Sequence, residues 1–201
     1  MNTKIAAAEA FEERVQDFKA LLLANAITSL SPKMVSLLDP EGGDFGKWLV
    51  EEGFFEAPAS TKYHGNYPGG LYDHSATVTH RLIWMTHALN LTWSRPESPF
   101  IVGMFHDLCK IDAYEPTEPC DESLAPYKHR KNLMYSGHGS RSLALLASKI
   151  PLTEEEIACI VYHMGAYETE MWQGYDLAIR KFPNVLWTHT ADMAASKIDE
   201  V

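Results

Sequence analysis

Apolar residues recur along much of the chain at steps of three or four, the spacing of one face of an α-helix. The first such series predicts a long N-terminal helix that ends before the break at Ser31 and Pro32. A Gly- and Pro-containing turn over 39–44, a short helix over 46–53 and a loop over 56–70 are predicted to follow. The apolar members of the first helix are Ile5, Ala8, Phe11, Val15, Phe18 and Leu22.

The same spacing returns in the remainder of the chain. Thr153 and Glu156 have the spacing of a capping box at the start of one of these later helices. The connection over 112–136 and the aromatic- and Gly-rich stretch over 164–183 carry no helical pattern and are predicted to be irregular. Because no segment alternates with period two, the sequence predicts an all-α fold. The predicted helices cover 71–89, 96–111, 137–150, 153–163 and 184–200.

Composition and charge narrow the class of protein. With 201 residues, 46% hydrophobic and 22% charged, the chain is predicted to form one globular domain over 1–201. The 27 acidic residues outnumber the 17 basic ones, and the formal charge of −10 argues against a long nucleic acid as partner. No apolar stretch suits a signal peptide or a membrane span, so we expect a cytoplasmic protein without a membrane partner. Cys109, Cys120 and Cys159 form no CxxC pair and are interpreted as buried or idle thiols.

Several predicted helices carry His or Asp where their apolar face should lie. These residues are His74, the adjacent pair His106 and Asp107, and Asp192. Each alone would be interpreted as a packed histidine or a paired charge, but burying all of them without a shared partner costs several kcal/mol, on the order of a buried ion pair left uncompensated. A metal ion is such a partner. The mixture of imidazole and carboxylate without thiolate suits Mn, Fe, Co, Ni, Zn or Mg.

The order of these residues resembles the H…HD…D signature of the HD-domain metal-dependent phosphohydrolase superfamily. The sequence segments that match are "GGLYDHSATV", "FHDLCKI" and "THTADMAAS". His138 in "SGHGSRS" and His163 in "VYHMGAY" stand where two-metal members place ligands of a second ion. The chain is most similar to stand-alone HD hydrolases and to the HD domain of certain bacterial 3'→5' exoribonucleases. The resemblance implies a compact HD-type bundle, with a metal-binding core over 64–198 and a helical extension over 1–55 packed on it.

The resemblance also implies roles for the ligands. One ion would be held by His74, His106, Asp107 and Asp192. A second would be held by His138 and His163, with Asp107 bridging the two. Two ions about 3.5–4 Å apart activate a hydroxide and polarise a phosphoryl oxygen for attack.

Other polar residues are candidates for substrate contacts. Lys110, three residues after Asp107, either neutralises a phosphate oxygen or forms a salt bridge with Asp107. His64, Arg141 and His189 are further substrate-binding candidates, for which packing is the alternative interpretation. Three remaining histidines are assigned to the surface or to packing: His80, His87 and His129.

Together these features predict a metal-dependent phosphohydrolase that holds one or two divalent transition ions. Asp107 and Lys110 are the expected catalytic residues. A small phosphorylated substrate, of the nucleotide or short oligonucleotide class, is favoured because no residues remain to build a separate nucleic-acid-binding module. The connection over 112–136 is either a substrate lid or a solvated loop. The alternatives are a di-iron HD-fold oxygenase, which would use the same ligand order, and a non-catalytic ligand-binding HD domain.

Overall fold

The computed structural model describes residues 2–117, 125–134, 137–167 and 171–201, and Cys120 lies outside these ranges. The prediction of an all-α fold is confirmed, with one short two-stranded sheet in the described part of the chain. No helix among these residues has the length and apolar character needed to cross a membrane. The α-helices are α1 Asn2–Ala26, α2 Pro32–Leu38, α3 Asp44–Glu51, α4 Gly70–Ala88, α5 Ser98–Phe105, α6 His138–Ala147, α7 Glu154–Val161, α8 Trp172–Lys181 and α9 Asn184–Ala194.

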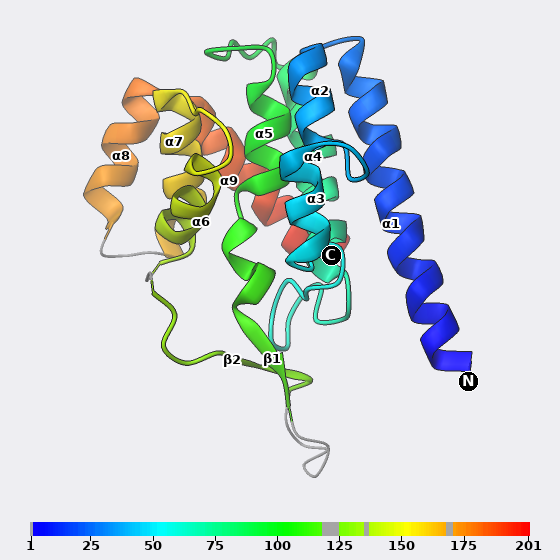
Figure 1. Cartoon of the computed structure of the whole chain (residues 1–201). Helices are drawn as coiled ribbons and strands as arrows, with labels where there is room; N and C mark the ends of the chain where they lie inside the picture. Colours follow the sequence, from blue (N-terminus) through cyan, green and yellow to red (C-terminus); the bar gives the residue numbers. More distant parts are fainter. Residues whose placement is uncertain (1, 118–124, 135–136, 168–170) are drawn as a thin grey trace.

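Helix α5 lies at the centre of the bundle. Every one of its residues is buried, and it packs along α4 on one side and against α7 and α9 on the other. Figure 1 shows α1 and α8 at opposite edges of the molecule, with α5 between them. Because α5 is apolar on all sides, it can only be an interior helix. The residues that follow it therefore emerge inside the molecule.

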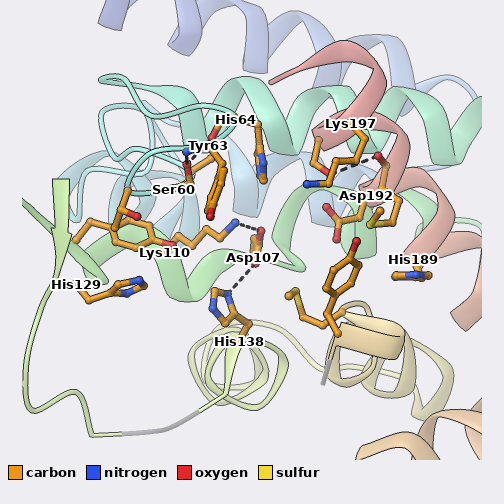
Figure 2. A pocket seen from close by; sticks show the side chains of 17 residues that line it. Ser60, Tyr63, His64, Asp107, Lys110, His129, His138, His189, Asp192 and Lys197 are labelled. Carbon is orange, nitrogen blue, oxygen red and sulfur yellow. Dashed lines mark hydrogen bonds and ion pairs between the residues drawn. The ribbon is translucent and has the colours of Figure 1, made fainter. Parts of the chain in front are cut away.

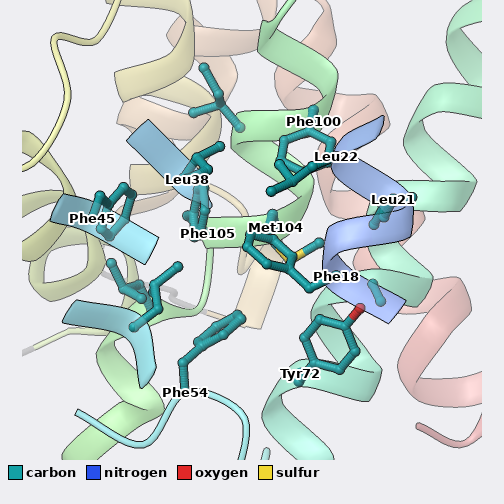
Figure 3. Packing of buried hydrophobic residues seen from close by; sticks show 14 of the residues in the cluster. Phe18, Leu21, Leu22, Leu38, Phe45, Phe54, Tyr72, Phe100, Met104 and Phe105 are labelled. Atoms are coloured by element: carbon teal, nitrogen blue, oxygen red, sulfur yellow. The ribbon is translucent and has the colours of Figure 1, made fainter. Parts of the chain in front are cut away.

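Two clusters of buried side chains form the core. The larger one joins α1 to α5 through a group of aromatic rings that includes Phe18, Phe54, Tyr72, Phe100 and Phe105 (Figure 3). The N-terminal helix therefore shares its core with the central helices rather than forming a separate unit. Ile5, the first apolar residue of the predicted series, lies outside this core and is 52% exposed. The smaller cluster lies between α4, α5, α7, α8 and α9.

The sequence predictions differ from the structure at several boundaries. The helix predicted over 96–111 ends at Phe105 and continues as the 3-10 helix η1, Leu108–Asp112. Helix α2 had no predicted counterpart, and α8 occupies part of the stretch predicted to be irregular. Within α8, Gly174 weakens the helical signal, yet a Cβ at this position would lie 2.5 Å from the Tyr162 hydroxyl. Close packing against Tyr162 thus explains why this helix contains a glycine, a residue that in the sequence favours a loop.

The connection over 112–136 contains a hairpin that the sequence did not reveal. Strands β1, Tyr114–Pro116, and β2, Tyr127–His129, pair antiparallel. Three residues are too few to establish an alternating pattern. The hairpin projects from one end of the bundle in Figure 1.

The first turn of α7 fixes the relative positions of three helices. The predicted capping box is present: Thr153 Oγ1 accepts from Glu156 N–H, and the Glu156 carboxylate accepts from Thr153 N–H. The same carboxylate, fully buried, accepts hydrogen bonds from Arg95 Nε at 2.8 Å and Ser98 Oγ at 2.8 Å, at the start of α5. Its neighbour Glu155 accepts from the Asn184 side chain, at the start of α9. Two adjacent carboxylates therefore connect α7 to α5 and to α9.

Replacing Glu156 should destabilise the protein. We expect Glu156→Ala to lower the free energy of unfolding by about 3 kcal/mol, because it removes the buried carboxylate that accepts from Arg95 and Ser98, together with half of the capping box. Urea denaturation followed by circular dichroism measures this loss. Glu154→Ala is the matched control in the same helical turn, since the exposed Glu154–Lys181 pair should contribute less than about 1 kcal/mol. Equal losses in both variants would contradict the argument.

Candidate metal centre

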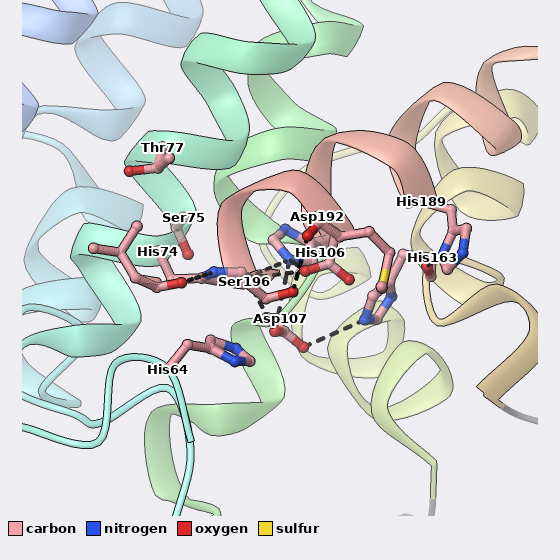
Figure 4. Close-up of polar contacts among 12 residues, drawn as sticks. His64, His74, Ser75, Thr77, His106, Asp107, His163, His189, Asp192 and Ser196 are labelled. Atoms are coloured by element: carbon pink, nitrogen blue, oxygen red, sulfur yellow. Dashed lines mark hydrogen bonds and ion pairs between the residues drawn. The ribbon is translucent and has the colours of Figure 1, made fainter. Parts of the chain in front are cut away.

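The six predicted metal ligands converge inside the bundle. They come from five places in the scaffold: α4 supplies His74, the end of α5 supplies both His106 and Asp107, and α9 supplies Asp192. His138 is the first residue of α6, and His163 follows the end of α7. Figure 4 shows the group around Asp107 and Asp192. His74, His106 and His163 are fully buried, and Asp107 is 2% exposed.

Two glycines permit this convergence. A Cβ on Gly103 would lie 2.6 Å from Thr79 Cα, so α4 and α5 approach each other only because this position has no side chain. A Cβ on Gly139 would lie 2.3 Å from the Val161 carbonyl oxygen, so α6 and the end of α7 likewise approach each other only because Gly139 has no side chain. The close approach of these helix pairs brings their histidines within reach of one another.

The hydrogen bonds of three imidazoles fix their tautomers. Nδ1 of His74 lies 2.9 Å from the backbone oxygen of Val201, Nδ1 of His106 lies 2.8 Å from that of Gly103, and Nδ1 of His163 lies 2.7 Å from that of Ile160. A carbonyl oxygen only accepts, so each Nδ1 must carry the proton. Each Nε2 is then a free acceptor that faces the centre. Metal-binding histidines are oriented in this way in proteins.

The first group of ligand atoms comprises His74, His106 and Asp192. His74 Nε2 lies 3.2 Å from Asp192 Oδ1 and 3.3 Å from His106 Nε2. With both Nδ1 atoms protonated, the two Nε2 lone pairs face each other and cannot form a hydrogen bond. A cation between them removes this conflict, and their nitrogen and oxygen donors are those that divalent transition ions take. These three residues can therefore hold a metal ion.

Asp107 lies between this group and a second one. Its Oδ2 accepts from Lys110 Nζ at 2.6 Å, whereas its Oδ1 lies 3.4 Å from His163 Nε2 and 3.7 Å from His138 Nδ1. Both latter distances are long for a hydrogen bond. Asp107 Oδ1, His138 Nδ1 and His163 Nε2 are buried atoms without a hydrogen-bond partner among the described residues. Buried polar atoms in such a state indicate a missing partner, and these three fit a second ion.

The electrostatics keep His106 neutral and Asp107 ionised, and they favour a positive charge beside His138. Burial lowers the pKa of His106 to about 4, so its imidazole is neutral. Burial opposes ionisation of Asp107, but the Lys110 ammonium and the neighbouring histidines together outweigh it and hold the pKa of the carboxyl well below its usual range. The Asp107 carboxylate raises the pKa of His138 to about 10, so this position favours a positive charge. Ionised carboxylates and neutral imidazoles are the ligand forms that a divalent ion requires.

The centre opens into a cavity of about 350 Å³. Asp107, Lys110, His138 and Asp192 form part of its wall, as Figure 2 shows. The exposed rings of Tyr63 and Tyr167 lie at its edge. The metal-ligand groups therefore communicate with a space that can admit a small molecule.

The substrate-binding candidates lie in different surroundings. His64 lines the cavity, its ring centroid is 5.0 Å from that of His74, and neither of its nitrogens has a hydrogen-bond partner within the described part of the chain. Burial lowers the pKa of His64 to about 4, which keeps it neutral. His189 also lines the cavity and donates from Nδ1 to the His163 carbonyl, which orients that segment.

Arg141 lies outside the cavity wall, whereas His129 is exposed on β2, as assigned, and also lines the cavity. The Arg141 guanidinium donates to the Cys109 carbonyl and to the Asp112 carboxylate, and Arg141 is not among the residues that line the cavity. The structure thus gives it a role in holding η1 on α6. His129, assigned to the surface or to packing, stands on β2 in the cavity wall with its ring 5.1 Å from that of Tyr114. Its place in the cavity wall could not be predicted, because the hairpin itself was not predicted.

Comparison of the chain with protein-family models, curated proteins and solved structures finds no match. The geometry of the residues therefore carries the functional argument.

The C-terminal segment supports His74 from outside the centre. After α9 the chain forms the π-helical turn η4, Ala195–Asp199, and Glu200 takes a left-handed conformation with φ 60°. Asp199 forms a two-point ion pair with Arg81, which lies two helical turns beyond His74 on α4. The segment thereby returns to α4, and the Val201 oxygen accepts from His74 Nδ1. The Arg81–Asp199 pair is thus placed to hold the acceptor that fixes the His74 ring.

Metal content tests the ligand assignment. Protein purified without chelators should carry about one to two transition ions per chain by elemental analysis. His106→Ala and Asp107→Ala should lose most of this metal, because each removes a donor that the other ligands cannot replace. His80→Ala, an exposed histidine on the same helix as His74, is the control and should keep it. Full metal occupancy in both ligand variants would refute the assignment.

Charge reversal tests the support from the C-terminal segment. Arg81→Glu or Asp199→Arg alone should weaken metal binding by about 10- to 100-fold, the usual effect of releasing the group that orients a ligand histidine. The double variant, which restores the pair with opposite polarity, should recover affinity. Competition with a chromophoric chelator measures the dissociation constants. Single variants with unchanged affinity would show that the ion pair does not act on His74.

Proposed function

We propose that the protein is a metal-dependent phosphohydrolase of the HD type that cleaves a phosphoester in a nucleotide or a short oligonucleotide. One observation carries the proposal. Imidazole nitrogens and carboxylate oxygens converge on both sides of Asp107, and in the described residues Asp107 Oδ1, His138 Nδ1 and His163 Nε2 have no hydrogen-bond partner. Asp107 also lines a cavity that holds the Lys110 side chain. Metal ligands beside a fixed cation in a cavity suit the stabilisation of a phosphate group.

The ligand groups define two metal positions. His74, His106 and Asp192 would hold one ion, His138 and His163 would hold another, and Asp107 would contribute to both. A bound divalent transition ion lowers the pKa of water and polarises a phosphoryl oxygen. The donor set favours Mn, Fe, Co, Ni or Zn, and Mg is a weaker fit because it prefers oxygen ligands.

Lys110 would supply the positive charge that phosphate requires. Its side chain is 8% exposed, and Nζ lies 2.6 Å from Asp107 Oδ2 while the side chain lines the cavity. The Asp107 carboxylate contributes to raising its pKa above the ordinary lysine value, against the opposing effect of burial, so the ammonium stays charged. A phosphate oxygen in the cavity can therefore accept from the same ammonium that neutralises Asp107. Both readings of Lys110, salt bridge and phosphate contact, are compatible in this arrangement.

The cavity favours a small substrate. About 350 Å³ lies at the lower end of the range for small-molecule sites. His64 can offer one hydrogen-bond donor and one acceptor, because its neutral imidazole has both nitrogens free. The exposed Lys197 on the opposite wall adds a second cation. These groups suit a phosphorylated compound with a polar body, such as a nucleotide.

A screen of phosphoesters tests the activity. Metal-loaded protein should release product from nucleoside monophosphates, cyclic nucleotides, short oligonucleotides or bis-p-nitrophenyl phosphate, measured with Mn, Co, Ni and Mg in turn. Lys110→Met should lower kcat/KM by about 10²-fold or more while metal content stays unchanged, because it removes charge stabilisation rather than a ligand. Lys33→Met, on the exposed face of α2, is the matched control and should retain full activity.

Two outcomes would count against the proposal. Full activity of Lys110→Met would remove Lys110 from the reaction. Absence of hydrolysis with every phosphoester by metal-loaded protein would reject phosphohydrolase function. Oxygen consumption by anaerobically iron-loaded protein, without phosphate release, would then favour the di-iron oxygenase, which needs the same ligands.

A further inference from the structure

Cys109 occupies an unusual position beside the second metal group. It lies in η1, two residues after Asp107, is a free thiol and is 3% exposed. It does not line the cavity, so it is not placed to attack a substrate. Its side chain instead lies on the α6 side of Asp107.

One face of α6 contacts each polar part of Cys109. Ser142 Oγ accepts from the Cys109 backbone N–H at 3.1 Å, and the Arg141 guanidinium donates to the Cys109 carbonyl. His138 lies three residues before Arg141 and four before Ser142, and so lies on the same face of α6. Its imidazole lies within metal-sharing distance of the thiol, because the ligand atoms of Asp107, Cys109 and His138 are all within 4.8 Å of one another. Both ends of the Cys109 backbone are thus held so that the thiol is directed at His138.

A second observation shows that this group lacks a partner. Asp107, whose side chain is 3% exposed, directs Oδ1 toward the group, and this atom has no hydrogen-bond partner in the described residues. His138 Nδ1 is likewise buried and unpartnered, 3.7 Å from Asp107 Oδ1. The gap between the two atoms is too long for a hydrogen bond and is compatible with an ion that both atoms bind at about 2.0–2.2 Å.

We propose that the Cys109 thiolate is a ligand of the ion held by Asp107 and His138. This inference rests on the proposed metal centre and extends it to the identity of the metal. On binding, the thiol releases its proton to solvent and the sulfur donates an electron pair to the ion. A thiolate favours Zn, Co, Ni or Fe over Mn and Mg, which prefer oxygen donors. The second position is therefore selective for the more thiophilic ions.

Cobalt substitution tests the ligand directly. Metal-free protein titrated with Co(II) should develop a thiolate-to-cobalt charge-transfer band in the near ultraviolet. Cys109→Ser should lose this band while it still binds cobalt through the remaining donors. Cys159→Ser is the matched control, because Cys159 is also a free and buried thiol but belongs to the core cluster beside α9. It should keep the band.

Metal preference provides an independent measurement. Chelator competition should show that Cys109→Ser weakens Zn(II) binding by about tenfold or more and leaves Mn(II) binding within about twofold. A charge-transfer band that persists in Cys109→Ser, or equal losses of zinc and manganese affinity, would overturn the inference.

The experiment separates this inference from the proposed function. If the wild-type protein binds cobalt without a charge-transfer band, Cys109 is not a ligand and the metal centre stands. If it binds neither cobalt, zinc nor manganese, the metal centre fails and the thiolate inference fails with it.

Discussion

The structure depends on a carboxylate that is almost fully removed from water. Transferring an ionised group such as that of Asp107 to the interior costs several kcal/mol unless other charges and hydrogen bonds compensate it. Lys110 donates to one oxygen. The second oxygen faces two imidazoles at distances too long for a hydrogen bond. The end of α5, the start of α6, the end of α7 and the inner face of α9 are all arranged around this one group.

The ligands are held by a scaffold that acts through helix ends. Glu155 and Glu156 at the start of α7 fix α9 and α5, the helices that lead to Asp192 and to His106. Backbone carbonyls at helix ends or in the C-terminal segment then accept from the Nδ1 atoms and turn each Nε2 inward. A rigid outer framework thus determines the orientation of the inner donors, which is what a preorganised metal site needs.

The chemistry follows from the same arrangement. Two donor groups share Asp107, and Asp107 forms an ion pair with Lys110, whose side chain lines the cavity. Charge on a substrate phosphate would therefore be met by ions and by an ammonium that are already in place, and this preorganisation is the main source of electrostatic catalysis. His138 lines the cavity, whereas Cys109 does not, so a ligand at Cys109 can influence the choice of metal without touching the substrate.

The sequence by itself determined the helical class, most helix positions, the capping box at Thr153 and four residues of the centre, His74, His106, Asp107 and Asp192. His138 and His163 were expected there only through the resemblance to the HD signature. Apolar spacing and caps are local properties, and His or Asp on an apolar face signals a shared buried site. Only the tertiary structure decided where α5 ends, that α8 exists, which nitrogens face inward, and that His129 lines the cavity while Arg141 supports η1. These features arise from contacts between residues far apart in sequence. The tautomer of His74, for instance, depends on Val201, 127 positions away, and no local pattern records such a contact.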